Sequence, residues 1–462
     1  MPQSVHSNSP PGGQPSLGDS IVSVFDENGQ DAAPRRRFTA MPWRDPANLI
    51  ELVAGRKVFV WGARHDGYAA RLALLRHGLA PVGFIDSSAA IQGTSIFGLP
   101  VASPAGHFSA CSPADGFIVI ASGFFADEIA ASCESAGWRK NRDFVVYGEL
   151  RALNYQVEVA GMCNLKCISC PRGNWPRHRK PGVMSAETYR KLVDKILADD
   201  PWTGIITLYN WGEPLLNPEL PEIIRITRDK GLLSAISSNL AMKKDFRAVV
   251  EAGPDWFRIS NSGWGENYET THSGAKWDTF LANCEKLADY RQELRPAMLV
   301  EFFFHIYSHN RDDFSRIRDL CDRLGFTLRY RHAALAPLDN VARVDNGKQI
   351  SAAAVQTRQL QFLSVEEVMD IARRERDRPC YYLDHVWIDW DLSVAHCMEW
   401  YDPSLILFDD FLTVSPEEIY AARVNSRHCR ECMARGIHRA YCVYGDEKLI
   451  AAKSSIPVQE EQ

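Results

Sequence analysis

The chain has 462 residues, of which 45% are hydrophobic and 24% charged, and its formal net charge is −6. This length exceeds what one compact core supports and predicts two to four domains, while the acidic balance disfavours a dedicated nucleic-acid-binding protein. The sequence lacks any run of about 18 uncharged apolar residues that could span a membrane. The first twenty residues also lack the basic start and apolar core of a secretory signal. We therefore expect a globular protein of the cytoplasm.

Residues 1–45 are rich in Pro, Gly, Ser and Asp, and they predict a disordered tail because so few apolar side chains cannot offset the chain entropy. From Lys57 onwards, short apolar strands alternate with an amphipathic helix and end at turn residues. The predicted strands are Val58–Trp61, Val82–Ile85, Gly116–Ala121 and Phe144–Tyr147. This pattern predicts a Rossmann-like α/β domain over residues 46–150. The first turn holds only Gly62 and Gly67 rather than three glycines, so nucleotide binding and simple docking both stay open as its role.

A second strand–helix alternation covers residues 151–345. Its predicted strands are Tyr155–Ala160, Gly204–Tyr209, Leu233–Ser237, Trp256–Ser260, Met298–Phe304 and Phe326–Tyr330. The predicted helices between them are Glu187–Ala198 with Ser185 as N-cap, Pro218–Lys230, Lys243–Ala252, Lys276–Tyr290 and Arg311–Leu324. Six such repeats predict a parallel, curved sheet, a partial (β/α)6 barrel. Active sites of barrels collect where the strands end, at their carboxyl termini.

Unusual polar segments follow four of these strands, which is where a barrel would carry its site. The cysteine motif follows the first strand, and the tetrapeptide Trp211–Pro214 follows the second. Two further polar segments, residues 238–239 and 260–262, follow the third and fourth strands. The fifth strand ends at three possible hydrogen donors or general bases, His305, Tyr307 and His309.

The first cysteine cluster comprises Cys163, Cys167 and Cys170, spaced by three and two residues. Thiolates bind iron–sulfur clusters, and three ligands in place of four leave one iron open for chemistry. A zinc site would need a fourth ligand. His178 is the nearest candidate, but it sits in the basic loop 172–180, which we expect to be solvated.

The second cysteine group lies near the C-terminus. Cys380 and Cys397 flank a predicted hairpin with its turn near residues 389–391, while Cys429 and Cys432 open a short helix or loop. Two such pairs supply the four thiolates of an iron–sulfur cluster or of a structural zinc site, and spacing alone does not separate the two. The cysteines outside both groups are interpreted as buried thiols: Cys111, Cys133, Cys284 and Cys321.

The segment CNLKCISC resembles the CxxxCxxC signature of the radical S-adenosylmethionine (SAM) superfamily. The resemblance implies a [4Fe-4S] cluster whose open iron binds SAM, reductive cleavage of SAM, and a 5′-deoxyadenosyl radical that abstracts hydrogen from a substrate. The stretch WGEPLLNPEL resembles the family's Gly-Gly-Glu-Pro motif, with Trp211 in place of one glycine. The cosubstrate-contacting residues implied by these motifs are Gly212, Glu213, Pro214, Ser238, Asn239 and Ser260.

Residues 346–450 resemble the SPASM/twitch extension of this superfamily, and residues 451–462 are predicted to form a tail. The resemblance implies an auxiliary [4Fe-4S] cluster held by Cys380, Cys397, Cys429 and Cys432. A full SPASM set would need about seven cysteines and this segment has five, so the four cysteines fit the shorter, twitch-like form with one cluster. Cys442 is then a spare ligand, a packed thiol or a hydrogen donor to the substrate.

These features predict a radical SAM oxidoreductase, of dehydrogenase or epimerase type, supplied with electrons by a flavodoxin or ferredoxin. The Rossmann-like domain favours a small or carbohydrate-like substrate and a net oxidation over the alternative, a peptide- or protein-modifying maturase. A non-enzymatic iron–sulfur or zinc scaffold would need neither a three-ligand cluster nor the Trp211–Pro214 segment. The sequence predicts no nucleic-acid or membrane partner.

Overall fold

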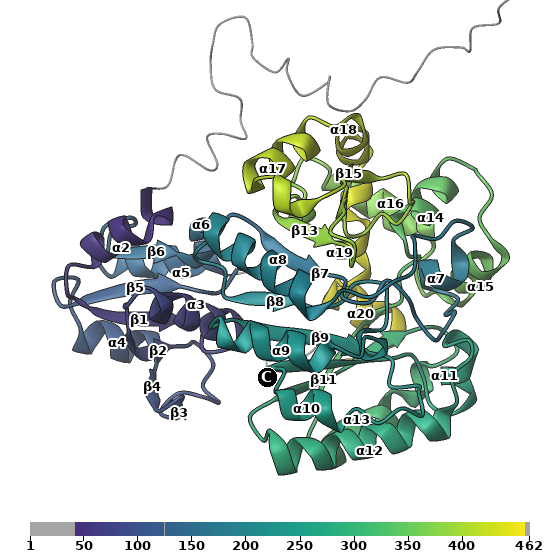
Figure 1. Ribbon diagram of the computed structural model, residues 1–462, viewed down its shortest axis with the longest axis horizontal. Coiled ribbons are helices and arrows are strands. Elements are labelled where there is room, and N and C mark those ends of the chain that lie inside the picture. Colours follow the sequence, from purple (N-terminus) through teal and green to yellow (C-terminus); the bar gives the residue numbers. More distant parts are fainter. Residues whose placement is uncertain (1–41, 124, 458–462) are drawn as a thin grey trace, which may run out of the picture.

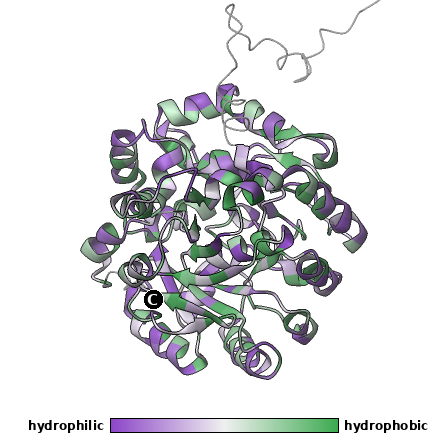
Figure 2. Cartoon of the chain, turned by 90° about the vertical axis from the view of Figure 1, so that its left-hand side faces the viewer, coloured by the Kyte–Doolittle hydropathy of each residue, from purple (hydrophilic) through white to green (hydrophobic). Residues whose placement is uncertain are grey.

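The computed structural model describes residues 42–123 and 125–457, and it builds the chain around two sheets flanked by helices (Figure 1). The smaller sheet has six strands in the order β3-β4-β2-β1-β5-β6, and the larger has nine in the order β12-β11-β10-β9-β8-β7-β13-β14-β15. Hydrophilic positions lie mainly on the outward faces of the peripheral helices (Figure 2). Within the described residues no helix is both long and apolar enough to cross a membrane.

The N-terminal sheet confirms the predicted Rossmann-like fold, because β2, β1, β5 and β6 are consecutive parallel neighbours. Its strands are β1 (Lys57–Trp61), β2 (Pro81–Ile85), β3 (Ser95–Ile96), β4 (Leu99–Ala102), β5 (Gly116–Ile120) and β6 (Phe144–Val146). Its helices are α2 (Pro46–Val53), α3 (His65–Arg76), α4 (Pro104–Ala110), α5 (Ala126–Ser135) and α6 (Tyr147–Leu150). Most of the predicted N-terminal tail lies outside the described residues, and its last part forms the short helix η2 (Pro42–Arg44).

This domain is packed firmly against the second sheet. Arg76, the last residue of α3, donates hydrogen bonds to the carbonyls of Pro201 and Gly231, at 3.0 and 2.6 Å. The ring of His65, at the start of α3, lies 4.6 Å from the ring of Trp256. The fully buried Trp202 belongs to the N-terminal core although it precedes a strand of the other sheet. These contacts agree with a docking role for the domain.

The larger sheet contains all six predicted barrel strands as parallel neighbours. They are β7 (Asn154–Val157), β8 (Ile205–Thr207), β9 (Leu233–Ser238), β10 (Trp256–Asn261), β11 (Leu299–Ile306) and β12 (Thr327–His332). The helices that cover it are α8 (Ala186–Asp199), α9 (Leu220–Asp229), α10 (Arg247–Ala252), α11 (Glu266–Thr271), α12 (Trp277–Leu294) and α13 (Phe314–Leu324). The Ser185 hydroxyl accepts the Thr188 N–H, so the predicted N-cap of α8 is confirmed.

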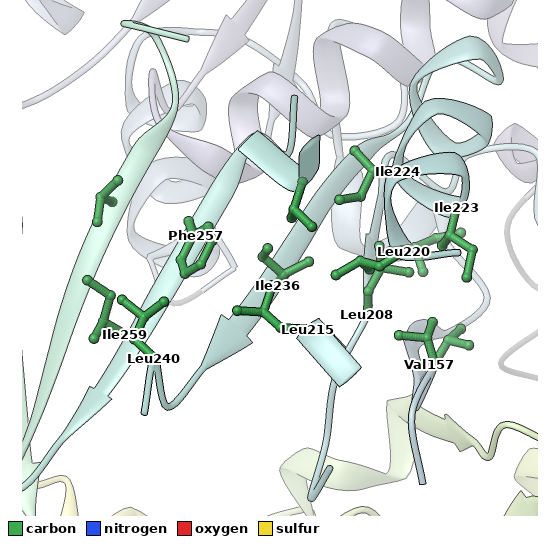
Figure 3. Close-up of a cluster of buried hydrophobic side chains, with 14 of the residues drawn as sticks. Val157, Leu208, Leu215, Leu220, Ile223, Ile224, Ile236, Leu240, Phe257 and Ile259 are labelled. Carbon is green, nitrogen blue, oxygen red and sulfur yellow. The ribbon is translucent and has the colours of Figure 1, made fainter. Parts of the chain in front are cut away.

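Side chains on the outer face of the sheet pack under these helices and form the main core (Figure 3). Phe257 and Ile259 of β10 point into this core and are fully buried. Because side chains alternate along a strand, Arg258 and Ser260 face the opposite, inner side. The inner face is therefore polar where the outer face is apolar.

The C-terminal part continues the barrel sheet rather than forming a separate layer. The predicted hairpin is present as β13 (His385–Ile388) and β14 (Val394–Ala395), followed by β15 (Ile406–Phe408), and β13 pairs in parallel with β7. Its helices include α14 (Leu338–Asp345), α15 (Ala352–Leu360), α16 (Val365–Arg374), α17 (Pro416–Val424), α18 (Arg427–Ala434), α19 (Ala440–Tyr444) and α20 (Glu447–Ser454). The pairing brings the end of the hairpin beside the loop that carries the first cysteines.

Candidate functional site

The first three cysteines lie on the loop between β7 and the short helix α7 (Pro171–Asn174), and all are free thiols. Burial and the nearby Glu213 raise the pKa of Cys163 to about 12. Burial raises the pKa of Cys167 further, with Cys170 and Cys163 as the next causes. Each thiol thus lies within electrostatic reach of the others, and neutral thiols are favoured until a cation compensates their charge. This donor set fits the positively charged iron–sulfide core of a cluster.

Asn239 joins the third strand to this loop. Its side-chain amide donates to the Cys163 sulfur at 3.6 Å and to the Asn164 side-chain oxygen at 3.0 Å. Its backbone N–H donates to the Glu213 carboxylate at 2.8 Å. The loops after β7, β8 and β9 therefore meet, as the barrel topology predicted.

Glu213 is 2% exposed, and its carboxylate also accepts the Leu215 N–H at 3.1 Å. Burial raises its pKa to about 7, against the lowering effect of these hydrogen bonds. Glu213 therefore connects the loop after β8 to the loop after β9 through these hydrogen bonds. Gly212 beside it has no room for a side chain, because a Cβ there would lie 1.7 Å from the Ala160 carbonyl oxygen.

The remaining predicted contacts lie in the same region. The Ser238 hydroxyl is 2% exposed and accepts the Leu240 N–H at 3.0 Å, which is a turn role. Ser260 lies on the inner face of β10, with its hydroxyl oxygen 3.5 Å from that of Ser237. Pro214 starts the short helix η3 (Pro214–Leu216).

The three residues expected at the end of the fifth strand occupy different surroundings. Burial, with Arg258 and Arg331 nearby, lowers the pKa of His305 to about 3, so its imidazole is neutral. Tyr307 is 1% exposed and hydrogen-bonds to the side chain of Ser169, within the first cysteine loop. His309 contacts the Asn267 carbonyl at 3.3 Å. Of the three, only His305 lies on the inner, polar face of the strand.

Several polar and charged side chains lie on that face together with His305. The Arg258 Nε lies 3.4 Å from the Glu301 carboxylate, and one Nη lies 3.4 Å from the Tyr209 hydroxyl. The Arg258 guanidinium also stacks over the Phe303 ring at 3.5 Å. Polar residues alternate with apolar ones along β10 and β11, and this alternation is visible in the sequence. Only the folded barrel, however, brings the polar residues of the two strands together.

The expectation that loop 172–180 is solvated is wrong for two of its arginines. Arg179 is 5% exposed, lies 3.7 Å from Asp389 and stacks over the Trp387 ring at 4.2 Å. Arg172 lies 3.7 Å from the buried Glu158. The parallel pairing of β13 with β7 explains this burial, because it places Glu158 and Asp389 side by side, just after the carboxyl ends of the two strands and next to the loop. His178 of the same loop is exposed, as expected.

Trp211 occupies the position where the family motif has glycine, and it contacts the C-terminal part. Its indole N–H donates to the Met398 carbonyl at 3.2 Å, and its own backbone N–H donates to Glu158 at 3.0 Å. Its ring meets Tyr401 edge-on at 6.4 Å. Trp211, which replaces the motif's glycine, thus connects the loop after β8 to the segment that follows Cys397.

The four C-terminal cysteines assigned to one site line one cavity. This cavity is bounded by Cys380, Cys397, Cys429 and Cys432 together with Leu338, Tyr382, Leu383, Trp400, His428, Met433 and His438. Burial raises the pKa of Cys397 and Cys432 above the usual value, with neighbouring cysteines as further causes. Cys380 and Cys432 are 52 positions apart in the sequence, and α18 brings Cys429 and Cys432 to the hairpin.

The surroundings of the Arg423 side chain indicate whether this site suits an anionic cluster. The side chain is 1% exposed and donates to the carbonyls of His385, Leu383 and Ala395. Burial lowers its pKa, while Cys397, Cys429 and Cys380 raise it more than any carboxylate does. A buried cation needs a negative partner, and four thiolates with their cluster provide one. Arg423 was not predictable from the sequence, because an arginine in the last turn of a helix gives no signal of burial.

Cys442 is half-buried on α19 and is not among the residues lining that cavity. It lies within electrostatic reach of Tyr381 and Tyr382. Across the described residues, no group of three or more His, Cys, Asp or Glu side chains is arranged to hold a metal ion as it stands.

The chain is similar to several known proteins. A relative of similar sequence is the probable GTP 3′,8-cyclase of Methanococcus maripaludis strain C5, 23% identical over 270 residues, which are 54% of this chain and 86% of the relative. The same enzyme of strain C7 is 29% identical over 30% of this chain, but the match spans only 46% of that relative. A similar solved structure is BtrN in complex with AdoMet and 2-DOIA, with 17% identity and a TM-score of 0.37 over 63% of this chain and 89% of BtrN.

A partial parallel barrel with three free cysteines on its first loop defines a cluster-dependent enzyme of the radical class. Residues 157–321 match the Radical SAM superfamily. The chain therefore contains a radical SAM domain and is a radical SAM enzyme, a class that uses a [4Fe-4S] cluster and SAM.

Proposed function

We propose that Cys163, Cys167 and Cys170 hold the SAM-binding cluster and that the cavity of four cysteines holds an auxiliary [4Fe-4S] cluster. When bound, the first cluster supplies the electron for reductive cleavage of SAM, whose adenosyl fragment takes a hydrogen atom from the substrate. Asn239 positions Cys163 through its amide, and Gly212 permits the close approach of the motif loop to the cysteine loop.

We further propose a net two-electron oxidation of a small or carbohydrate-like substrate. The substrate loses a hydrogen atom to the adenosyl fragment, then one electron and one proton. Cys380, Cys397, Cys429 and Cys432 would supply all the thiolates of a cluster held in this cavity, so such a cluster would accept the electron and would not bind the substrate. This enclosed set of four cysteines is the observation on which the proposal depends.

The inner face of the barrel suits a polar substrate. Arg258, Glu301 and Tyr209 offer donors and acceptors there, and the neutral His305 can accept a hydrogen bond from a substrate hydroxyl. The His305 Nδ1 faces the Asn261 carbonyl at 3.3 Å, which leaves Nε2 for such a contact.

Three measurements test the proposal. Anaerobically reconstituted protein is expected to bind about eight irons, and the triple Cys163/Cys167/Cys170→Ala variant about four. The product is expected to weigh two hydrogens less than the substrate. An unchanged product mass with solvent deuterium incorporated would contradict the oxidation and indicate an epimerase, with Cys442 as the candidate hydrogen donor. Zinc in place of iron at both sites would refute the cluster assignments.

A further inference from the structure

A second cavity, of about 360 Å³, lies beside the four-cysteine site in the C-terminal part of the chain. Its aromatic walls come from both cysteine segments: Trp175 lies five residues after Cys170, and Trp400 lies three residues after Cys397. We call it the Trp175–Trp400 pocket. Its size is in the range that holds small organic ligands.

The pocket shares a wall with the four-cysteine site. Trp400, His428 and Cys432 line both cavities. The His428 ring meets the Trp400 ring edge-on at 4.2 Å, and its buried Nε2 has no hydrogen-bond partner in the described part of the chain. A ligand in the pocket would therefore lie directly beside Cys432, one of the four cysteines, with Trp400 and His428 as the rest of the shared wall.

The acidic groups of the pocket already have partners elsewhere in the chain. Asp402 pairs with Arg177 outside the pocket. Glu431 pairs with Arg427 at 2.7 Å, also outside. Asp339 accepts the backbone N–H of Tyr401 at 2.9 Å. These carboxylates have little capacity left to bind a cationic ligand.

Two of the three arginine and lysine side chains that line the pocket have no acidic partner among the described residues, whereas the third, Arg435, pairs with Asp345. Arg343 and Lys348 both line the pocket and form no salt bridge within residues 42–123 and 125–457. The turn through Gly347, with φ of +64°, folds the chain back so that the Lys348 N–H donates to the Arg343 carbonyl at 2.8 Å. The Arg343 guanidinium also lies 5.8 Å from the centre of the Trp175 ring. Two neighbouring cations thus stand at the edge of an aromatic wall.

We propose that the Trp175–Trp400 pocket binds a small organic anion with a flat ring, the ring lying against the indoles and the anionic group meeting Arg343 and Lys348. Indole faces stack on flat rings, and guanidinium and ammonium groups form charge-assisted hydrogen bonds with phosphates and carboxylates. None of the residues proposed to hold the first cluster or SAM lines this pocket, so the two sites are distinct. Trp175 belongs both to the pocket wall and to the aromatic cluster against which Trp211 packs.

The test is titration calorimetry of the reconstituted holoprotein with three probes: 1-naphthyl phosphate, 1-naphthol and inorganic phosphate. The first is expected to bind at least about tenfold more tightly than either of the others, because only it offers both ring and charge. Arg343→Ala and Lys348→Ala are each expected to weaken its binding about fivefold, as for an exposed charge pair. Saturating SAM should not displace it.

The matched control is Lys448→Ala, which removes an exposed lysine of α20 outside the pocket and should leave the affinity unchanged. All three lysine and arginine side chains are exposed, so each variant is expected to fold. Absence of binding at about 5 mM, equal binding of naphthol, or displacement by SAM would each overturn the proposal. Because the measurement reports binding alone, its result is independent of whether the enzyme oxidises its substrate.

Discussion

Arg423 provides the sharpest prediction, because a guanidinium that is 1% exposed has cysteines rather than carboxylates as its main negative neighbours. Arg423→Gln removes the charge and most of the three hydrogen bonds to the carbonyls of Leu383, His385 and Ala395. Each buried carbonyl left without a donor costs about 1–3 kcal/mol. Loss of one partner from a buried charge pair costs about 3–5 kcal/mol.

Such a loss is comparable to the whole stability of a domain, which is about 5–15 kcal/mol. The carbonyls belong to the chain segments beside Cys380 and Cys397, so their release should open the four-cysteine site. We expect anaerobically reconstituted Arg423→Gln protein to bind about four irons in place of about eight, while SAM cleavage continues.

The assay is iron content together with redox titration followed by electron paramagnetic resonance. Arg423→Lys keeps the charge without the three-way hydrogen bonding, and it is expected to retain more iron than the Gln variant. Any auxiliary cluster kept by the Gln variant should have a more negative reduction potential, because a nearby positive charge favours the reduced state. Arg427→Gln, at a side chain that is 87% exposed, is the control. About eight irons and an unchanged potential in Arg423→Gln would refute the reasoning.

Three further predictions concern single positions. Gly212→Ala forces a Cβ against the Ala160 carbonyl and should abolish SAM binding in equilibrium dialysis, whereas Gly148→Ala, with open space around it, should leave SAM binding intact. Burial raises the pKa of Asp339 to about 6, so its ionisation opposes folding as the pH rises from 5 to 7. Asp339→Asn should therefore gain about 1 kcal/mol of stability relative to the wild type over that range in chemical unfolding, and a constant difference would contradict this. Cys442→Ser should leave the iron content unchanged, since Cys442 does not line the four-cysteine cavity, and loss of iron would make it a ligand.

The order of the elements followed from local pattern alone. All six barrel strands and four of the six strands of the N-terminal sheet were predictable, because apolar residues recur with the period of a buried strand, and helices such as α8 carry their own cap at Ser185. The short strands β3 and β4, of two and four residues, were not predicted, because so few residues show no period. The spacing of Cys163, Cys167 and Cys170 was equally local, and it identified the class of enzyme before any contact was known.

Contacts between distant segments were decided only by the tertiary structure. The parallel pairing of β13 with β7 joins residues more than 200 positions apart, and no periodicity within either strand encodes that partner. That pairing buries Arg179 against Asp389, although its charged loop has the composition of a solvated surface. Arg423 is the clearest case, because burial of a charge depends on which groups meet it: three carbonyls and the cysteines from separate segments reach it only in the folded chain.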